Sequence, residues 1–150
     1  MSLNERLLTD MKNAMKEKEA GKQKLSVIRM VRAAVKNAEI NLQKELNDEE
    51  VTEILAREVK QRRDSIPEYE KANRQDIIDN LQAEIDILLE YLPKQLTADE
   101  IREITKKIIA EVGAATSKDI GKVMGKLMPQ VKGKSDGKLV NSIVKELLNG

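Results

Sequence analysis

Apolar residues recur every three or four positions in seven segments of this chain of 150 residues. No segment alternates apolar and polar residues, as a half-buried strand would. A period of three to four residues is typical of a helix that buries one face. The apolar set is Leu, Ile, Val, Met and Ala, with no Phe or Trp and two Tyr, and these aliphatic residues are strong or acceptable helix formers. The sequence therefore predicts an all-α fold.

Start signals mark where the expected helices begin. Ser2 with Glu5, and Thr97 with Glu100, match a capping box, in which the two side chains satisfy free backbone N–H groups at a helix start. Asn73 is expected to cap the fourth helix. The seven helices are expected to begin at about residues 2, 22, 49, 73, 97, 116 and 137.

The three prolines supply the stop signals. Pro67 should bend or interrupt the third helix, because proline lacks an N–H and clashes with the preceding turn. Pro129 and the stretch KGKSDGK should break the sixth. Pro93 ends the fourth helix and is the clearest boundary in the chain. We therefore expect an N-terminal bundle of four helices, residues 1–94, followed by a smaller three-helix C-terminal domain, residues 95–150.

The missing residue types restrict the chemistry. Without Cys there is no thiol nucleophile or zinc–thiolate site, and without His there is no imidazole base or His-bound metal. We therefore expect no catalytic residues, no cofactor and no metal, which favours a non-catalytic protein. The chain also lacks a signal-peptide pattern at its start and any apolar run of about 18 residues. These absences predict a cytoplasmic protein that does not enter a membrane.

Charge is unevenly distributed, although the formal net charge is only +1. Residues 1–46 carry 10 basic and 6 acidic side chains (+4), residues 47–112 carry 10 and 17 (−7), and residues 113–150 carry 7 and 3 (+4). Such asymmetry can mark a surface on which a polyanion docks. It can equally arise by chance in a highly charged surface.

The segment SKDIGKVMGKLMPQVKGKSDGK near the C-terminus combines lysine with glycine. Lys118, Lys122 and Lys126 recur every four residues and should share one helical face. Gly121 and Gly125 lie between them, and each costs a helix about 1 kcal/mol relative to Ala. Close approach of a ligand or of another backbone would offset that cost. Alternatively, the glycines only let two helices pack closely and the lysines keep the surface soluble.

The same segment continues into a glycine-rich turn before the last expected helix. Lys132, Lys134 and Lys138 surround Gly133 and Gly137 in this turn. Exposed N–H groups and the helix dipole favour an anion such as a phosphate at a helix N-terminus. The functional interpretation is therefore a phosphate backbone that follows the lysines.

A second basic series lies on the expected second helix. Lys22, Arg29, Arg32 and Lys36 lie along one stripe, which either binds an anionic partner or is simply solvated. Basic residues also occur among acidic ones between residues 57 and 64, where ion pairs three or four residues apart explain them.

Four stretches together resemble the YqeY-like proteins over essentially the whole chain. They are LSVIRMVRAAVKNAEI, RRDSI followed by ANRQDI, EYLPKQLTADEI, and EVGAATSKDIGKVMGKLMPQVKGKSDGKLVNSIVKELL. The last stretch also resembles the tail domain of the B subunit of the tRNA-dependent amidotransferase. Pro67 and Tyr69 depart from the family pattern, which leads us to expect a non-proline and often Phe at these positions.

The resemblance implies an N-terminal helical bundle, a smaller helical domain and an association with tRNA. It also implies a link to carbon–nitrogen ligase activity with glutamine as the amide donor, but the catalytic cradle of the B subunit has no counterpart here. The leading hypothesis is a non-catalytic, tRNA-associated RNA-binding accessory protein, with tRNA or a tRNA-associated protein complex as partner. The alternative is a helical protein-interaction module without RNA binding, and a third possibility is a component of the amidotransferase. The predicted RNA-binding residues are Lys118, Lys122, Lys126, Lys132, Gly133, Lys134, Gly137 and Lys138.

Overall fold

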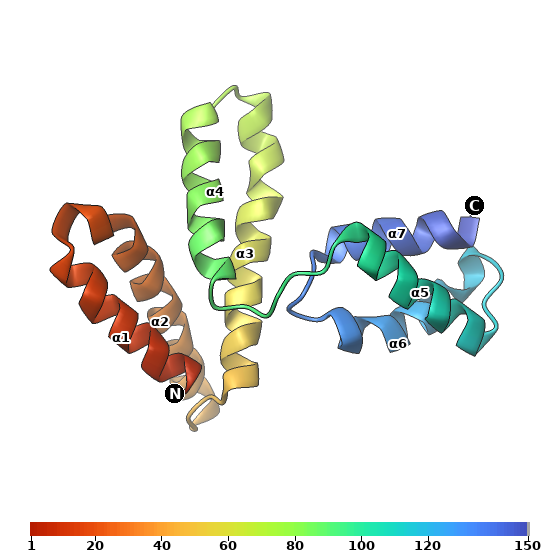
Figure 1. The fold of residues 1–150 in the computed structure, drawn as a ribbon, viewed down its shortest axis with the longest axis horizontal. Coiled ribbons are helices and arrows are strands. Elements are labelled where there is room, and N and C mark those ends of the chain that lie inside the picture. The colour runs from red at the N-terminus through yellow and green to blue at the C-terminus, as the bar shows by residue number, and fades with distance from the viewer. Residues whose placement is uncertain (150) are drawn as a thin grey trace. The chain divides into compact units, whose positions relative to one another are not determined.

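The computed structural model describes residues 1–149, which form α-helices and two short 3₁₀ helices but no strand (Figure 1). This confirms the predicted all-α fold class. The helices are α1 (Leu3–Lys16), η1 (Lys18–Gly21), α2 (Lys22–Leu42), α3 (Asp48–Lys71), α4 (Gln75–Leu89), α5 (Ala98–Val112), η2 (Ser117–Asp119), α6 (Ile120–Val131) and α7 (Gly137–Asn149).

Both predicted capping boxes are present, at Ser2 for α1 and at Thr97 for α5. Asn47 forms a third with Glu50 at the start of α3. Asn73, in contrast, caps nothing, because its φ of 56° places it in the left-handed region, within the turn between α3 and α4. Thr116 forms a fourth capping box with Asp119 at the start of η2, so local hydrogen bonding sets each of these helix starts.

Two prolines lie inside helices that they were expected to interrupt. The helix α3 continues past Pro67 to Lys71, and α6 continues past Pro129 to Val131. Both prolines are exposed, so the carbonyl group that each leaves without a helical donor can be solvated. The predicted interruption of α3 at Pro67 is therefore wrong, whereas a bend there stays a prediction. The helix α6 is not broken at Pro129 itself, but it ends at Val131, where the KGKSDGK stretch begins.

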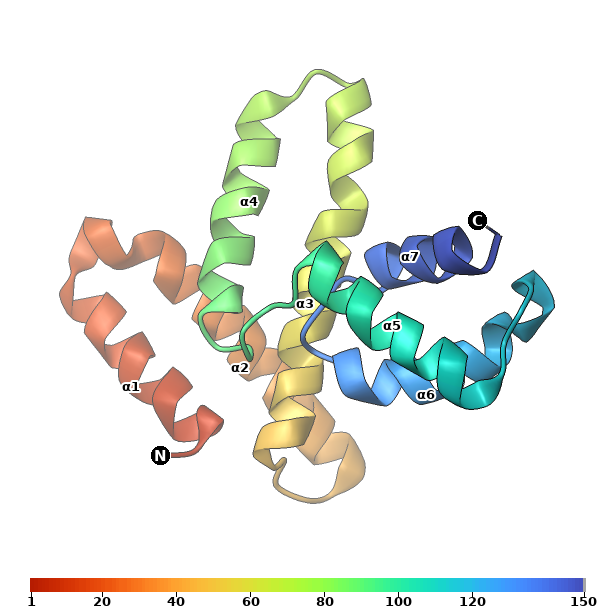
Figure 2. The same cartoon turned by 45° about the vertical axis from the view of Figure 1, so that its right-hand side comes forward.

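The chain divides into two compact units, Met1–Leu92 and Pro93–Gly150. In the first unit α1 packs along α2 and α3 packs along α4 (Figure 1, Figure 2). Independent folding of the two predicted domains stays a prediction. The buried core of the first unit consists of Leu7, Val27, Ile28, Val31, Val35, Leu46, Val51, Ile54, Leu55, Val59, Ile85, Leu88 and Tyr91.

The second unit surrounds its own core with α5, α6 and α7. Its first residues are tied to the connection between α6 and α7. The backbone N–H of Leu96 donates to the carbonyl oxygen of Lys134 at 2.7 Å, and the side chain of Gln95 donates to that of Gly133 at 3.0 Å. The buried core consists of Ile101, Ile108, Val123, Leu127, Val131, Val140, Ile143, Val144 and Leu148.

Gly21 is required at the corner between η1 and α2. It is buried, and a Cβ atom at this position would lie 2.2 Å from the carbonyl oxygen of Ala14. A backbone atom cannot be moved aside as a flexible side chain can. Glycine therefore allows the end of α1 and the start of α2 to approach each other closely.

Replacement of Gly21 by Ala should destabilise the first unit by about 1–3 kcal/mol, because the added methyl group overpacks a rigid contact. Gly125→Ala is the matched control, since a Cβ at Gly125 meets no atom within 4 Å. This second variant should stabilise its helix by up to ~1 kcal/mol. Urea denaturation followed by far-ultraviolet circular dichroism measures both changes. Equal effects of the two variants would contradict the interpretation.

Candidate functional site

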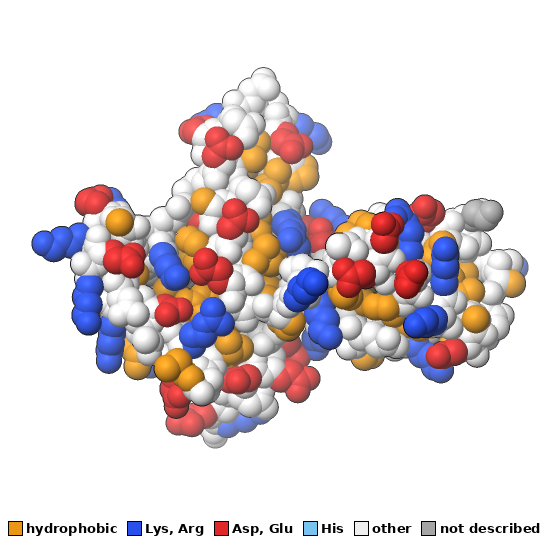
Figure 3. Space-filling model, viewed as in Figure 1, with side chains coloured by type: hydrophobic (Ala, Val, Ile, Leu, Met, Phe, Trp, Pro, Cys, Tyr) orange, Lys and Arg blue, Asp and Glu red, His pale blue; other side chains and the backbone are white. Residues whose placement is uncertain are grey.

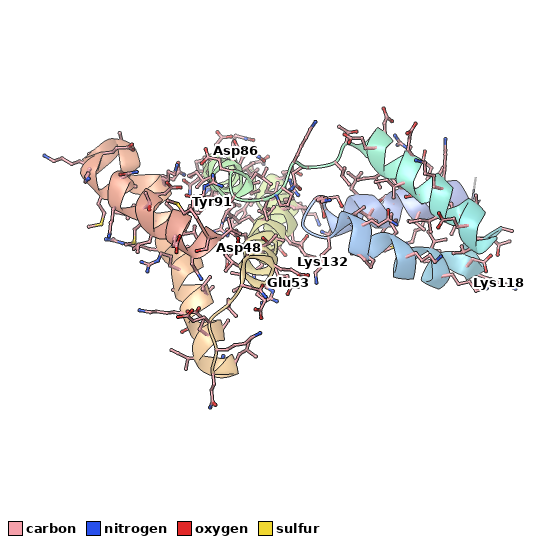
Figure 4. All side chains as sticks on the ribbon, turned by 60° about the horizontal axis from the view of Figure 1, so that its bottom comes forward. Asp48, Glu53, Asp86, Tyr91, Lys118 and Lys132 are labelled. Atoms are coloured by element: carbon pink, nitrogen blue, oxygen red, sulfur yellow. The ribbon has the colours of Figure 1, made fainter. Side chains whose placement is uncertain are left out.

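The three lysines predicted to share one helical face belong to two consecutive elements. Lys118 lies in η2, and only Lys122 and Lys126 lie in α6. Lys132 follows α6, and Figure 4 shows it at the opposite end of the second unit from Lys118. The continuous lysine track expected from the spacing is therefore divided.

Carboxylates also lie among these lysines. Lys126 Nζ is 3.9 Å from a carboxylate oxygen of Glu111. The pKa of Asp119 is held below its ordinary value, first by hydrogen bonds from backbone N–H groups at residues 115 and 116 and then by the charge of Lys122. Figure 3 shows basic and acidic side chains intermixed on the visible face of this unit. A polyanion would meet negative as well as positive charge here.

The glycine-rich turn is bonded to the chain itself. The carbonyl oxygens of Gly133 and Lys134 accept the hydrogen bonds from Gln95 and Leu96 described above. Asp136 occupies the start of α7, where its carboxylate accepts a hydrogen bond from the backbone N–H of Lys138 at 3.0 Å. A carboxylate therefore already binds one of the free N–H groups at this helix start, so an anion at Gly137 would meet negative charge.

The glycines of α6 have no close neighbour among the described residues. A Cβ added at Gly121 or Gly125 would meet no atom within 4 Å, and both residues are exposed. The prediction that another backbone approaches them is therefore wrong for contacts within this chain. Gly133 differs, because its φ of 75° lies in the left-handed region that favours glycine.

The basic series of α2 remains on the surface. Lys22, Arg29 and Lys36 are exposed, and none has an ion-pair partner among residues 1–149. Arg32 is different, since it is half-buried and its guanidinium lies 3.2 Å from Met11 Sδ. Three of the four residues thus remain available for a partner outside the unit.

Apolar residues are exposed on the same side of α2. Ile40 is 70% exposed and Met30 48% exposed, and Ala33 is also exposed between them. Helical spacing places Ile40 and Ala33 opposite the buried stripe that includes Val31 and Val35. Met30 lies at the edge of that stripe, and its Sδ atom is 3.2 Å from the guanidinium of Arg62. We call this surface the outer face of α2. It consists of Lys22, Arg29, Ala33, Lys36 and Ile40.

A hollow of about 660 Å³ lies beside this helix in the first unit. Leu8, Val35 and Leu46 form its apolar part. Its polar groups include Glu39, whose carboxylate accepts a hydrogen bond from the Leu46 backbone, and Ser2, the cap of α1. Local structure therefore already uses several of the polar groups that could hold a ligand.

A buried arginine is the strongest feature that the sequence did not reveal. Arg62 is 7% exposed, and its guanidinium lies 2.8 Å from the Glu58 carboxylate, 3.7 Å from that of Glu84 and 3.2 Å from Met30 Sδ. The pairs Arg62–Glu58 and Lys60–Asp64 confirm the predicted i, i+4 ion pairs. Only the contacts from α2 and α4 were not predictable, because they join residues distant in the sequence.

A second polar cluster joins α1 to the end of α4. The Tyr91 hydroxyl donates to the Asp10 carboxylate, and the Arg6 guanidinium lies 4.5 Å from the centre of the Tyr91 ring. Arg6 also donates to the carbonyl oxygen of Glu90 at 3.0 Å. Burial, followed by the hydrogen bond to Asp10, raises the pKa of Tyr91 well above its ordinary value of 10.0.

Within residues 1–149 no three or more Asp or Glu side chains are grouped so that they could hold a metal ion. None of the helices in this range has the length and apolar character that crossing a membrane requires. The two clusters built on Arg62 and Tyr91 join helices inside the first unit. The outer face of α2 is therefore the candidate site that the fold itself does not use.

These features define a helical protein of two compact units, with polar clusters that join helices within the first unit. The family model for Yqey-like protein matches residues 4–148, so the chain belongs to this family. This confirms the resemblance found in the sequence.

Among curated proteins the chain is similar to "Altered inheritance of mitochondria protein 41, mitochondrial". The relative from Pyrenophora tritici-repentis is 30% identical over 95% of this chain and 79% of its own length. The protein of that name from Lachancea thermotolerans is 34% identical over 68% and 54%, respectively. The protein from Saccharomyces cerevisiae is 29% identical over 91% and 78%.

These names correct two predictions. The prediction of a cytoplasmic protein is wrong, because the relatives are named mitochondrial. The prediction of a tRNA-associated RNA-binding accessory protein is also wrong, because the names refer to the inheritance of mitochondria and not to RNA. The intermixed carboxylates and the capped start of α7 give a physical reason. The names state no binding partner, so the predicted partners and the contact role of the C-terminal lysines and glycines stay predictions.

Replacement of Arg62 by Leu should destabilise the first unit by about 3–5 kcal/mol, because Glu58 and Glu84 would be left without a cation in a largely buried position. The triple variant Arg62→Leu, Glu58→Gln, Glu84→Gln should recover part of that loss. Urea denaturation compares the two. If the triple variant is no more stable than the single one, the charges are not the cause.

The raised pKa of Tyr91 predicts a loss of stability in alkali. In the unfolded chain the hydroxyl ionises near its ordinary pKa of 10.0, whereas in the folded protein it stays protonated to higher pH. The stability from this group is therefore complete below pH 10 and is lost as pH rises from 10 towards the folded-state pKa. Unfolding free energies measured from pH 8 to 11 should fall more steeply for the wild type than for Tyr91→Phe. Parallel curves would contradict this assignment.

Proposed function

We propose that this chain is a helical protein-interaction module that acts in mitochondria and binds a partner through the outer face of α2. The observation that supports this proposal is that one face of α2 presents exposed apolar residues beside cations. These cations have no ion-pair partner among residues 1–149. Ile40 is the large exposed apolar residue of this face, Ala33 is exposed near it, and Arg29 and Lys36 lie beside them.

The energetics of folding do not account for this face. An exposed Ile40 adds nothing to the buried core, and cations without a partner give no ion-pair energy. In a complex, however, an apolar centre excludes water and surrounding charges orient the partner. The outer face of α2 has both parts, an apolar centre of Ala33 and Ile40 and charged residues around it.

The mitochondrial part of the proposal rests on the relatives. Each of the three relatives described above is named mitochondrial, and the first covers 95% of this chain. These names do not state a chemical reaction, since they describe the inheritance of mitochondria. A binding module agrees with that description because it requires no catalytic group.

A photoreactive amino acid placed at Asn37 tests the proposal. Asn37 is exposed and lies on the outer side of α2, whereas Gln61 is an exposed position on α3 and serves as the control. In mitochondria isolated from cells that express the chain, illumination should give a discrete crosslinked protein from position 37 and not from position 61. Ile40→Asp should abolish this product, because it places a charge in the apolar part of the proposed contact. The fold should not change, because Ile40 is 70% exposed and lies outside the core.

A crosslink that persists with Ile40→Asp would contradict the proposed contact. The absence of any crosslink from position 37 would do so as well. Exclusion of the chain from the mitochondrial fraction would contradict the location, independently of the binding surface.

A further inference from the structure

The helix α4 presents charges opposite in sign to those of α2. Its 15 residues contain Asp76, Asp79, Glu84 and Asp86 but no Lys or Arg. The helix α2 contains five basic residues and one acidic residue, Glu39. A mainly basic helix and a purely acidic helix thus belong to the same compact unit, Met1–Leu92.

The acidic side chains of α4 gather on its exposed side. Asp79 and Asp86, the second of which Figure 4 labels, are exposed, and Ala83 lies between them on the same side. Asp79 accepts a hydrogen bond from Gln75 at 2.7 Å, and Asp86 accepts one from Gln82 at 3.2 Å. Neither aspartate has an ion-pair partner among residues 1–149. We call Asp79, Ala83 and Asp86 the outer face of α4.

The spacing of the charges is the same on the two helices. Asp79 and Asp86 are seven residues apart, as are Lys22 and Arg29, and Arg29 and Lys36. Seven residues advance a helix by about 10.5 Å and by nearly two full turns. Two aspartates on one helix can therefore face two consecutive cations on another helix in a single alignment.

We infer that the outer face of α2 binds the outer face of α4 of a second copy of this chain. This inference rests on the proposed function, since it names the occupant of the same α2 surface. In a dimer with two-fold symmetry each copy supplies one α2 face and one α4 face, so the contact forms twice. The small side chain of Ala83 leaves room for the exposed apolar residues of the opposite α2 face, Ile40 among them.

Charge also disfavours the other pairings. Two α2 faces would bring Arg29 and Lys36 against their own copies, and two α4 faces would oppose aspartate to aspartate. Juxtaposed like charges are strongly unfavourable, which makes the mixed pairing specific. Because the ion pairs are exposed, salt should weaken the association.

A charge swap tests this inference in the purified full-length chain. The first variant carries Arg29→Glu and Lys36→Glu, and the second carries Asp79→Lys and Asp86→Lys. At an ionic strength of about 0.05 M, sedimentation should give the wild type about twice the 16.9 kDa of one chain. Each variant alone should be monomeric, with a dissociation constant raised ~100-fold or more.

An equimolar mixture of the two variants should restore the dimer. The acidic α2 of the first variant then faces the basic α4 of the second, and the unchanged faces also match. Lys106→Glu with Lys107→Glu is the matched control, because it reverses two exposed charges on α5. This control should dimerise like the wild type.

Three results would overturn the inference: a monomeric wild type, a control that dissociates as much as the first variant, or a mixture that stays monomeric. Each is distinguishable from failure of the proposed function. If the wild type is monomeric but position 37 still crosslinks to a different protein in mitochondria, the α2 surface binds another partner. If the dimer forms and accounts for the crosslink at position 37, both proposals are supported.

Discussion

The guanidinium of Arg62 holds three helices of the first unit at a single point. It projects from α3, pairs with Glu58 on the same helix and Glu84 on α4, and reaches the sulfur of Met30 on α2. Among aliphatic side chains that pack in many equivalent ways, a buried cation needs partners at defined positions. The helices that meet at Arg62 also carry the outer faces of α2 and α4. The positions of those faces therefore depend on an interaction that neither of them contains.

Local signals in the sequence were sufficient to predict most of the fold. Periodicity located the helices, and the Ser2 and Thr97 capping boxes are present because each involves only residues three positions apart. Asn73 did not behave as a cap, since the α3–α4 turn requires a left-handed residue there. Pro67 did not interrupt α3, because packing along α4 stabilises a long helix whose proline faces water. In both cases, contacts between helices outweighed a local preference.

The predicted C-terminal site could not be judged from spacing alone. A glycine-rich turn before a helix resembles an anion site when only the sequence is known. The structure shows Asp136 as the cap of α7 and the carbonyl oxygen of Gly133 bonded to Gln95, which lies 38 residues earlier. The α2 cations were recognised in the sequence, but the exposure of Ile40 beside them became evident only when the opposite stripe of α2 was seen to fill the core. Fold and site thus differ in how much they depend on distant contacts.

The position of the two tyrosines has a practical consequence for spectroscopy. The chain contains no Trp or Phe, and both Tyr69 and Tyr91 belong to the unit Met1–Leu92. Intrinsic fluorescence and near-ultraviolet absorbance therefore arise entirely from that unit, because Pro93–Gly150 contains no aromatic side chain. A fluorophore attached to the second unit would be read without any background from its own side chains. Natural fluorescence together with one such label would follow the two halves of the molecule separately in a single cuvette.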